Sequence, residues 1–95
     1  MQVQIRGKKW NLCVLRENNS AYDRGQCDPP NKQGKQIRIY PAAFKTDHRL
    51  METLIHEALH AACWDLDEEL VEDFSHDVAR ILLKCGFSRT EDDDG

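Results

Sequence analysis

Hydrophobic and polar residues alternate in three short stretches of the first half of the chain. Residues 1–6 and 10–16 show this period-two pattern on either side of a turn at Gly7, which predicts an N-terminal β-hairpin. Residues 36–40 alternate again, and the Pro that follows favours a third strand exposed at a sheet edge. Residues 17–35 gather Asn, Asp, Gly and Pro, so we expect a long loop there.

The second half of the chain has helical periodicity. Apolar residues recur every three or four positions from Asp47, a predicted N-cap, to about Cys63. A second amphipathic helix is predicted to start after Asp67, which is suited to cap it, and to end at Gly86. The pattern therefore predicts an α+β fold, in which a small antiparallel sheet of about three strands packs on two C-terminal helices.

The length and composition limit the domain organisation. Ninety-five residues are enough for one compact domain, which we place at residues 1–90, with residues 91–95 as an acidic tail. The net charge is −4 and the basic residues are scattered, so direct nucleic-acid binding is not expected. No apolar run approaches the roughly 18–20 residues of a membrane span. The N-terminus alternates instead of forming a signal-peptide core, and the four cysteines form no CxxC pair, so we expect a cytoplasmic protein with free thiols.

The predicted first helix contains the motif HExxH, at residues 56–60. Positions four apart stack on one face of a helix, so His56 and His60 can direct two imidazoles at one metal ion. Glu57 lies beside them, where it can hold a water molecule. The alternative is that the two histidines merely cap the helix or pair with nearby acids.

A catalytic zinc site usually takes three protein ligands and leaves one position for water. If the two helices fold back antiparallel about Leu66, His60 lies level with Glu72, and His56 lies level with His76. Glu72 is therefore the predicted third ligand, although an acid on this acidic helix can also be simply solvated. The competitors for this position are Glu68, Glu69 and His76.

Other side chains are candidates for supporting roles. His76 shares a helix face with Glu72, so it can hydrogen-bond a ligand, replace Glu72 on the metal, or donate to an oxyanion. Tyr40 and Tyr22 are further candidates for the oxyanion donor, although Tyr40 is otherwise simply a strand aromatic. His76 can equally be an ordinary surface histidine, and we expect His48 to be an unrelated surface residue.

The stretch from Gln36 to Phe87 resembles the HExxH metallopeptidase superfamily, especially the very small gluzincin-like and SprT-like zinc peptidases of bacteria and their phages. The resemblance covers the strand at residues 37–39, the motif within residues 52–61, and the acidic segment at residues 64–69. It implies a minimal zincin-like fold in which the two motif histidines bind Zn²⁺ and the motif glutamate is the general base.

The subfamily is narrowed by departures from known patterns. A metzincin would need Gly and His where this chain has Cys63 and Leu66. A thermolysin-like spacing would put the third ligand near Arg80, which cannot bind a metal. SprT-like proteins place a further histidine near a glycine, whereas Asp77 follows the one downstream histidine here. The pattern that fits is a compressed gluzincin, whose glutamate follows about a dozen residues after the motif.

The resemblance implies a zinc-dependent metalloendopeptidase that hydrolyses a protein or peptide substrate. Glu57 would take the proton of the attacking water, and the predicted edge strand at residues 36–40 would bind the substrate in extended form. A domain this small offers a shallow cleft, which a partner or a second copy in a homo-oligomer would complete. One alternative is a non-catalytic, metal-stabilised protein-binding module of phage or mobile-element origin, and another is a metal-free domain. Glu57 argues against the binding module, because a structural metal site needs no base.

Overall fold

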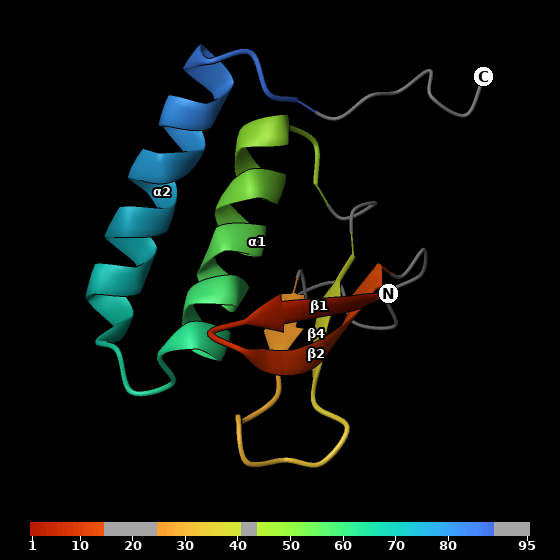
Figure 1. The fold of residues 1–95 in the computed structure, drawn as a ribbon. Coiled ribbons are helices and arrows are strands. Elements are labelled where there is room, and N and C mark those ends of the chain that lie inside the picture. Colours follow the sequence, from red (N-terminus) through yellow and green to blue (C-terminus); the bar gives the residue numbers. More distant parts are fainter. Residues whose placement is uncertain (15–24, 41–43, 89–95) are drawn as a thin grey trace, which may run out of the picture.

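The computed structural model describes residues 1–14, 25–40 and 44–88. It confirms the predicted α+β class, with a sheet followed by two helices (Figure 1). The predicted acidic tail and most of the first half of the predicted loop lie outside the described residues. In chain order the elements are β1 (Gln2–Ile5), β2 (Lys8–Val14), β3 (Gly25–Cys27), β4 (Gln36–Ile39), α1 (Asp47–Ala62) and α2 (Glu68–Lys84).

The N-terminal hairpin is present, with a tighter turn than predicted. β1 and β2 pair antiparallel, with Ile5 opposite Lys8, so two residues connect them. Arg6 and Gly7 both have positive φ, 52° and 77°, as a type I′ turn requires. The Arg6 side chain also donates through Nη1 to the carbonyl oxygen of Ala62 at 3.0 Å, which ties the hairpin to the end of α1.

The sheet has the strand order β1-β2-β4-β3 and is mixed, because β2 and β4 run parallel. β4 therefore lies inside the sheet, so the prediction that residues 36–40 form an exposed edge is wrong. The edge position on that side belongs to β3, which pairs antiparallel with β4 and arises within the predicted loop. A strand of three residues is too short to show an alternating pattern, so the sequence gives no signal for it.

Helix α1 lies between the sheet and α2 (Figure 1). Its sheet-facing side contributes Ala61 to a core with Trp10, Ile37 and Ile39, which are at most 3% exposed. Alternate residues of β4 enter this core, whereas Arg38 points to the opposite face and binds polar side chains. The motif helix is thus held from two sides, by apolar contacts with the sheet and by α2.

The helix ends follow ordinary capping chemistry. Thr46, one residue before the predicted cap Asp47, accepts a hydrogen bond from the first turn of α1 at 3.3 Å. Asp67 caps α2 as predicted, through its carboxylate at 3.2 Å from a backbone N–H. Gly86, with φ of 97°, ends α2, and the next N–H bonds back to the carbonyl of Leu82 at 3.1 Å, as in a Schellman motif.

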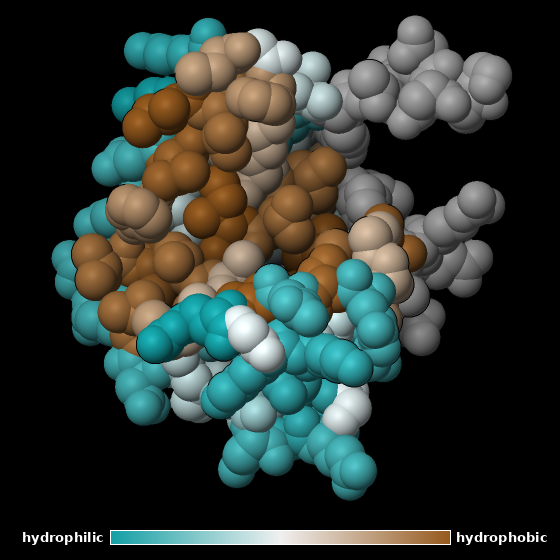
Figure 2. Space-filling model, in the orientation of Figure 1, coloured by the Kyte–Doolittle hydropathy of each residue, from teal (hydrophilic) through white to brown (hydrophobic). Residues whose placement is uncertain are grey.

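Apolar side chains gather on the surface of the helical part, whereas the sheet end is mostly hydrophilic (Figure 2). On α2, Leu70, Phe74 and Ile81 are each at least half exposed. A contiguous exposed apolar area often marks a surface that binds another molecule. In residues 1–14, 25–40 and 44–88, neither helix has the length and apolar character that a membrane crossing requires.

Candidate metal centre

The two motif histidines lie side by side on α1. Residues 56 and 60 are one helical turn apart, and their rings meet edge to face with centroids 4.8 Å apart. The Nε2 atoms of His56 and His60 are 3.2 Å from each other. Both side chains are about one-fifth exposed or less, so the pair is open to solvent on one side only.

Glu68, the first residue of α2, brings its carboxylate to this pair. Its Oε1 lies 2.9 Å from Nε2 of His56, and its Oε2 lies 3.1 Å from Nε2 of His60. The three side chains each offer one ligand atom within 4.8 Å of the others. The structure therefore gathers a His2Glu set, the composition that the sequence predicts.

The carboxylate that lies beside the two histidines is Glu68, one of the predicted competitors, and not Glu72, the preferred residue. Glu72 is exposed, and like Glu69 it is absent from the metal-ligand groups that the described residues form. The physical reason is the path of the connection. The last turn of α1 lies directly beside the first turn of α2, so the bend between the two antiparallel helices is centred on Trp64 and not on Leu66. This displaces the partner of His60 by one helical turn, from Glu72 to Glu68.

The set can hold a cation, and it is also satisfied without one when each histidine carries its proton on Nε2 and donates to one oxygen of Glu68. A neutral imidazole carries one N–H and one lone pair, and a carboxylate only accepts hydrogen bonds. If His56 and His60 both turned neutral Nε2 lone pairs toward Glu68, the contacts would be repulsive. A bound metal ion or a proton on a histidine removes the conflict. Two imidazoles and one carboxylate are a typical donor set for Zn²⁺, so the residues present fit this ion.

Glu57 lies next to the set. Burial raises its pKa above the ordinary value of 4.5; the charges of His56 and His60 lower the pKa and Glu68 raises it. A carboxyl whose pKa moves toward neutrality is better suited to accept and return a proton. It lines a cavity of about 340 Å³, whose other lining residues are Cys27, His60, Trp64, Leu66 and Glu68.

Strand β3 approaches the motif through a glycine. A Cβ on Gly25 would lie 2.8 Å from Cγ2 of Thr53 and 3.3 Å from Cγ of Glu57, so only glycine allows this close approach. Two residues on, Cys27 reaches the cavity, and burial together with Glu57 raises the pKa of its thiol to about 12. Cys27 therefore presents a neutral thiol, not a thiolate, to the cavity.

A buried ion pair fixes the turn between β3 and β4. Asp28 is 5% exposed and accepts hydrogen bonds from Nη2 of Arg38 at 2.8 Å and from the backbone of Gln36 at 2.9 Å. The hydrogen bond from Arg38 is the main reason that the pKa of Asp28 is lowered. These bonds clamp the two ends of residues 28–36, which keeps β3 in register beside α1.

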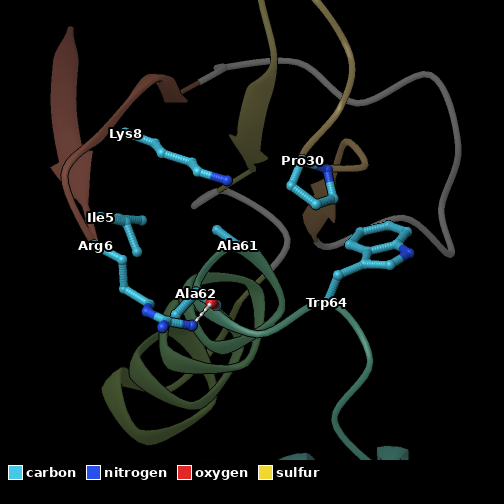
Figure 3. A pocket seen from close by; sticks show the side chains of 7 residues that line it. All are labelled: Ile5, Arg6, Lys8, Pro30, Ala61, Ala62 and Trp64. Atoms are coloured by element: carbon cyan, nitrogen blue, oxygen red, sulfur yellow. Dashed lines mark hydrogen bonds between the residues drawn. The ribbon is translucent and has the colours of Figure 1, made fainter.

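A second cavity, of about 220 Å³, is also lined by Trp64 (Figure 3). Trp64 lines both cavities, and its ring meets that of His60 edge to face with centroids 6.1 Å apart. The hairpin contributes Arg6 and Lys8 to this second cavity, so its wall carries positive charge. Trp64 is thus a wall residue that the two cavities share next to the candidate metal centre.

The predicted supporting residues lie elsewhere. Nδ1 of His76 is 3.3 Å from a carboxylate oxygen of Glu52. His76 lies two turns after Glu68 on α2, which is about 12 Å by helical rise. His76 is therefore neither a ligand of this centre nor its oxyanion donor. Tyr40 is not among the residues that line the cavity of Glu57, and Tyr22 lies outside the described residues.

No protein-family model, curated protein or solved structure matches this chain. The candidate centre therefore rests on the residues of the chain itself. The sequence named Glu68 only as a competitor for the third ligand, and it did not indicate Cys27 or Trp64 for the site. A signal was available for Glu68 alone, because it directly follows the cap Asp67 and the connection from α1 is short.

Proposed function

We propose that this protein is a zinc-dependent peptidase. One observation carries the proposal: the Nε2 atoms of His56 and His60 converge on the carboxylate of Glu68 at 2.9 and 3.1 Å, with Glu57 beside them at the same cavity. A purely structural site would need the three ligands but no carboxylate of raised pKa next to them. Glu57 is the residue that makes the arrangement catalytic.

When bound, a zinc ion supplies a Lewis acid that acidifies water and polarises a peptide carbonyl. The residues of the chain do the rest. His56, His60 and Glu68 would hold the ion, and Glu57 would accept the proton of the attacking water on a carboxylate oxygen. Glu57 would then give this proton to the amine that leaves.

The substrate enters the cavity that Glu57 lines. Within the described residues, β3 lies at the end of the sheet, beside β4, and helps to wall this cavity. Gly25 holds this strand close to α1, and Cys27 brings its end to the cavity of Glu57. The predicted substrate-binding role of residues 36–40 as an edge strand does not hold, because β4 lies between β2 and β3.

The setting of the enzyme follows from its thiols and its surface. All four cysteines are free, which favours a reducing compartment, so we place the activity in the cytoplasm. The half-exposed apolar residues of α2 favour a protein partner or a second copy on that face.

The test compares wild type with Glu57→Gln, and with Glu72→Gln as a control that removes an equivalent charge from an exposed position. Zinc content is measured by mass spectrometry, and hydrolysis is measured on unfolded casein. We expect stoichiometric zinc in all three proteins and a loss of activity of about 10²–10⁴-fold in Glu57→Gln alone. Zinc in all three without cleavage by any would favour the binding module. Absence of zinc after reconstitution would refute the proposal.

A further inference from the structure

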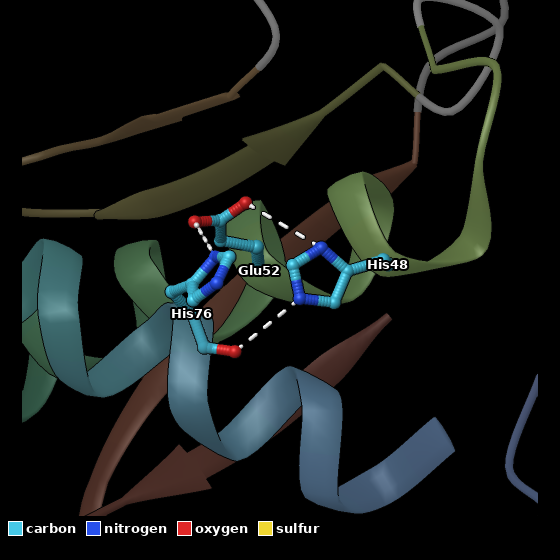
Figure 4. Close-up of side chains that lie close together, drawn as sticks. All are labelled: His48, Glu52 and His76. Carbon is cyan, nitrogen blue, oxygen red and sulfur yellow. Dashed lines mark hydrogen bonds and ion pairs between the residues drawn. The ribbon is translucent and has the colours of Figure 1, made fainter. Parts of the chain in front are cut away.

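A second group of metal-ligating side chains lies farther along the same two helices. His48 and Glu52 are one turn apart on α1, and His76 faces them from α2 (Figure 4). Nδ1 of His48 lies 4.0 Å from Oε1 of Glu52, and Nδ1 of His76 lies 3.3 Å from Oε2 of the same carboxylate. We propose that these three residues form a second metal site, which takes a first-row divalent cation such as Zn²⁺ and clips α1 to α2.

The hydrogen bonding of His48 is that of a metal ligand. Its Nε2 lies 3.3 Å from the backbone carbonyl oxygen of His76, and because a carbonyl only accepts, Nε2 carries the hydrogen. The lone pair of a neutral His48 is then on Nδ1, which faces Glu52 at 4.0 Å (Figure 4). Two acceptors at that distance share no hydrogen bond. Histidines that bind metals commonly donate their other N–H to a carbonyl in this way.

His76 has a competitor for the metal. Its Nε2 lies 2.6 Å from Nη2 of Arg80, and since a guanidinium only donates, Nε2 accepts and the ring proton is on Nδ1, toward Glu52. A metal ion on Nδ1 replaces that proton, and Nε2 then carries the hydrogen and becomes a donor. Arg80 must turn away, which its exposed position permits. Arg80 therefore opposes metal binding, and this gives the site a distinctive signature.

The second site is separate from the candidate metal centre. Its ligands on α1 lie two turns before His56 and His60, or about 12 Å by helical rise. Paired metal ions that share one reaction lie about 3.5–4 Å apart, so a cation here has a structural role. It would join the start of α1 to the middle of α2. The sequence does contain a signal, because residues 48, 52, 56 and 60 recur at intervals of four.

The test is a titration of metal-stripped protein with Zn²⁺. We expect wild type to bind two equivalents of Zn²⁺. His48→Gln or His76→Gln should lower the affinity for the second equivalent by at least about tenfold, because changes to residues that do not even touch the metal already cost about that much. Arg80→Met is the sharpest variant. It should raise the affinity for the second Zn²⁺ because it removes the donor that competes for His76. If the three residues form only a hydrogen-bonded cluster, the variant would lose a contact and its affinity for Zn²⁺ would not rise.

The double variant His56→Gln/His60→Gln separates this site from the peptidase proposal. It should keep one equivalent, and Zn²⁺ should raise its melting temperature because the ion binds the folded chain. Adding His48→Gln should abolish both effects, whichever way the cleavage assay turns out. The inference is overturned if wild type binds a single equivalent that the double variant loses. If a variant proves unfolded by circular dichroism, Arg80→Met against wild type decides, and unchanged or weaker second-site binding refutes the site.

Discussion

Replacing Glu68 by Gln tests the identity of the third ligand most directly. The substitution keeps the shape of the side chain but removes the charge that lies 2.9 and 3.1 Å from the two histidines. Changes in the outer shell of a metal site already cost about 10–100-fold in affinity, so loss of a direct ligand should weaken zinc binding by about 10²–10³-fold. That range corresponds to about 3–4 kcal/mol. Glu72→Gln removes the same charge one turn farther along α2 and should leave zinc affinity unchanged.

The stability of the metal-free protein provides an independent check. The side chain of Glu68 is 60% exposed, and exposed ion pairs contribute about 0–1 kcal/mol, so Glu68→Gln should melt close to wild type without metal. Zinc affinity is measured by competition with a chromogenic chelator, and melting is followed by circular dichroism with a chelator present. If Glu72→Gln weakens zinc binding more than Glu68→Gln does, the helices pair about Leu66 after all. Equal affinities in all three proteins would mean that neither glutamate is a ligand.

Three further predictions concern stability, each measured by urea unfolding. Ser75→Ala should stabilise the protein by about 1 kcal/mol, because the hydroxyl is fully buried and has no hydrogen-bond partner among the described residues; a loss of stability would show that the hydroxyl is bonded. Gly25→Ala should destabilise it by about 1–3 kcal/mol, since the new Cβ would lie 2.8 Å from a methyl of Thr53, and adding Thr53→Ser should restore part of the loss. Asp28→Asn should cost about 1–3 kcal/mol at pH 7 by weakening the bonds to Arg38. Because folding lowers the pKa of Asp28, its contribution to stability is complete above the ordinary pKa of 3.8 and is lost as the pH falls through the lower pKa of the folded state. The stabilities of wild type and variant should therefore converge in acid. A difference in stability that persists there would refute the assignment.

The two ways of pairing the helices differ by one turn, and this small difference decides the chemistry. One turn of helix is about 5.4 Å, more than twice the length of a zinc-ligand bond. Helical periodicity places Glu68, Glu72 and His76 on one side of α2, but it carries no information on which residue of α1 each of them faces. The height depends on the connection at residues 63–67 and on side-chain packing between the helices. A sequence pattern therefore predicts the kind of ligand better than its position.

The same distinction holds for the sheet. The hairpin of β1 and β2 follows from alternation and a tight turn, which are properties of neighbouring residues. The parallel pairing of β2 with β4 and the edge position of β3 join residues that are far apart in the chain. Local sequence does not encode such contacts. They arise because β4 must bury Ile37 and Ile39 against α1, and pairing on both of its sides satisfies its backbone groups.

The features that depend on local geometry follow from the amino-acid sequence alone. The four-residue spacing of His56 and His60 brings their imidazoles to one face of any helix, and Asp67 caps α2 through its own first turn. The contact of Glu68 with the two histidines, and that of His76 with Glu52 and His48, depend on how the two helices pack. Those contacts connect two helices whose relative height is set by packing and by the path of the connection, and no periodicity within a single helix contains that information.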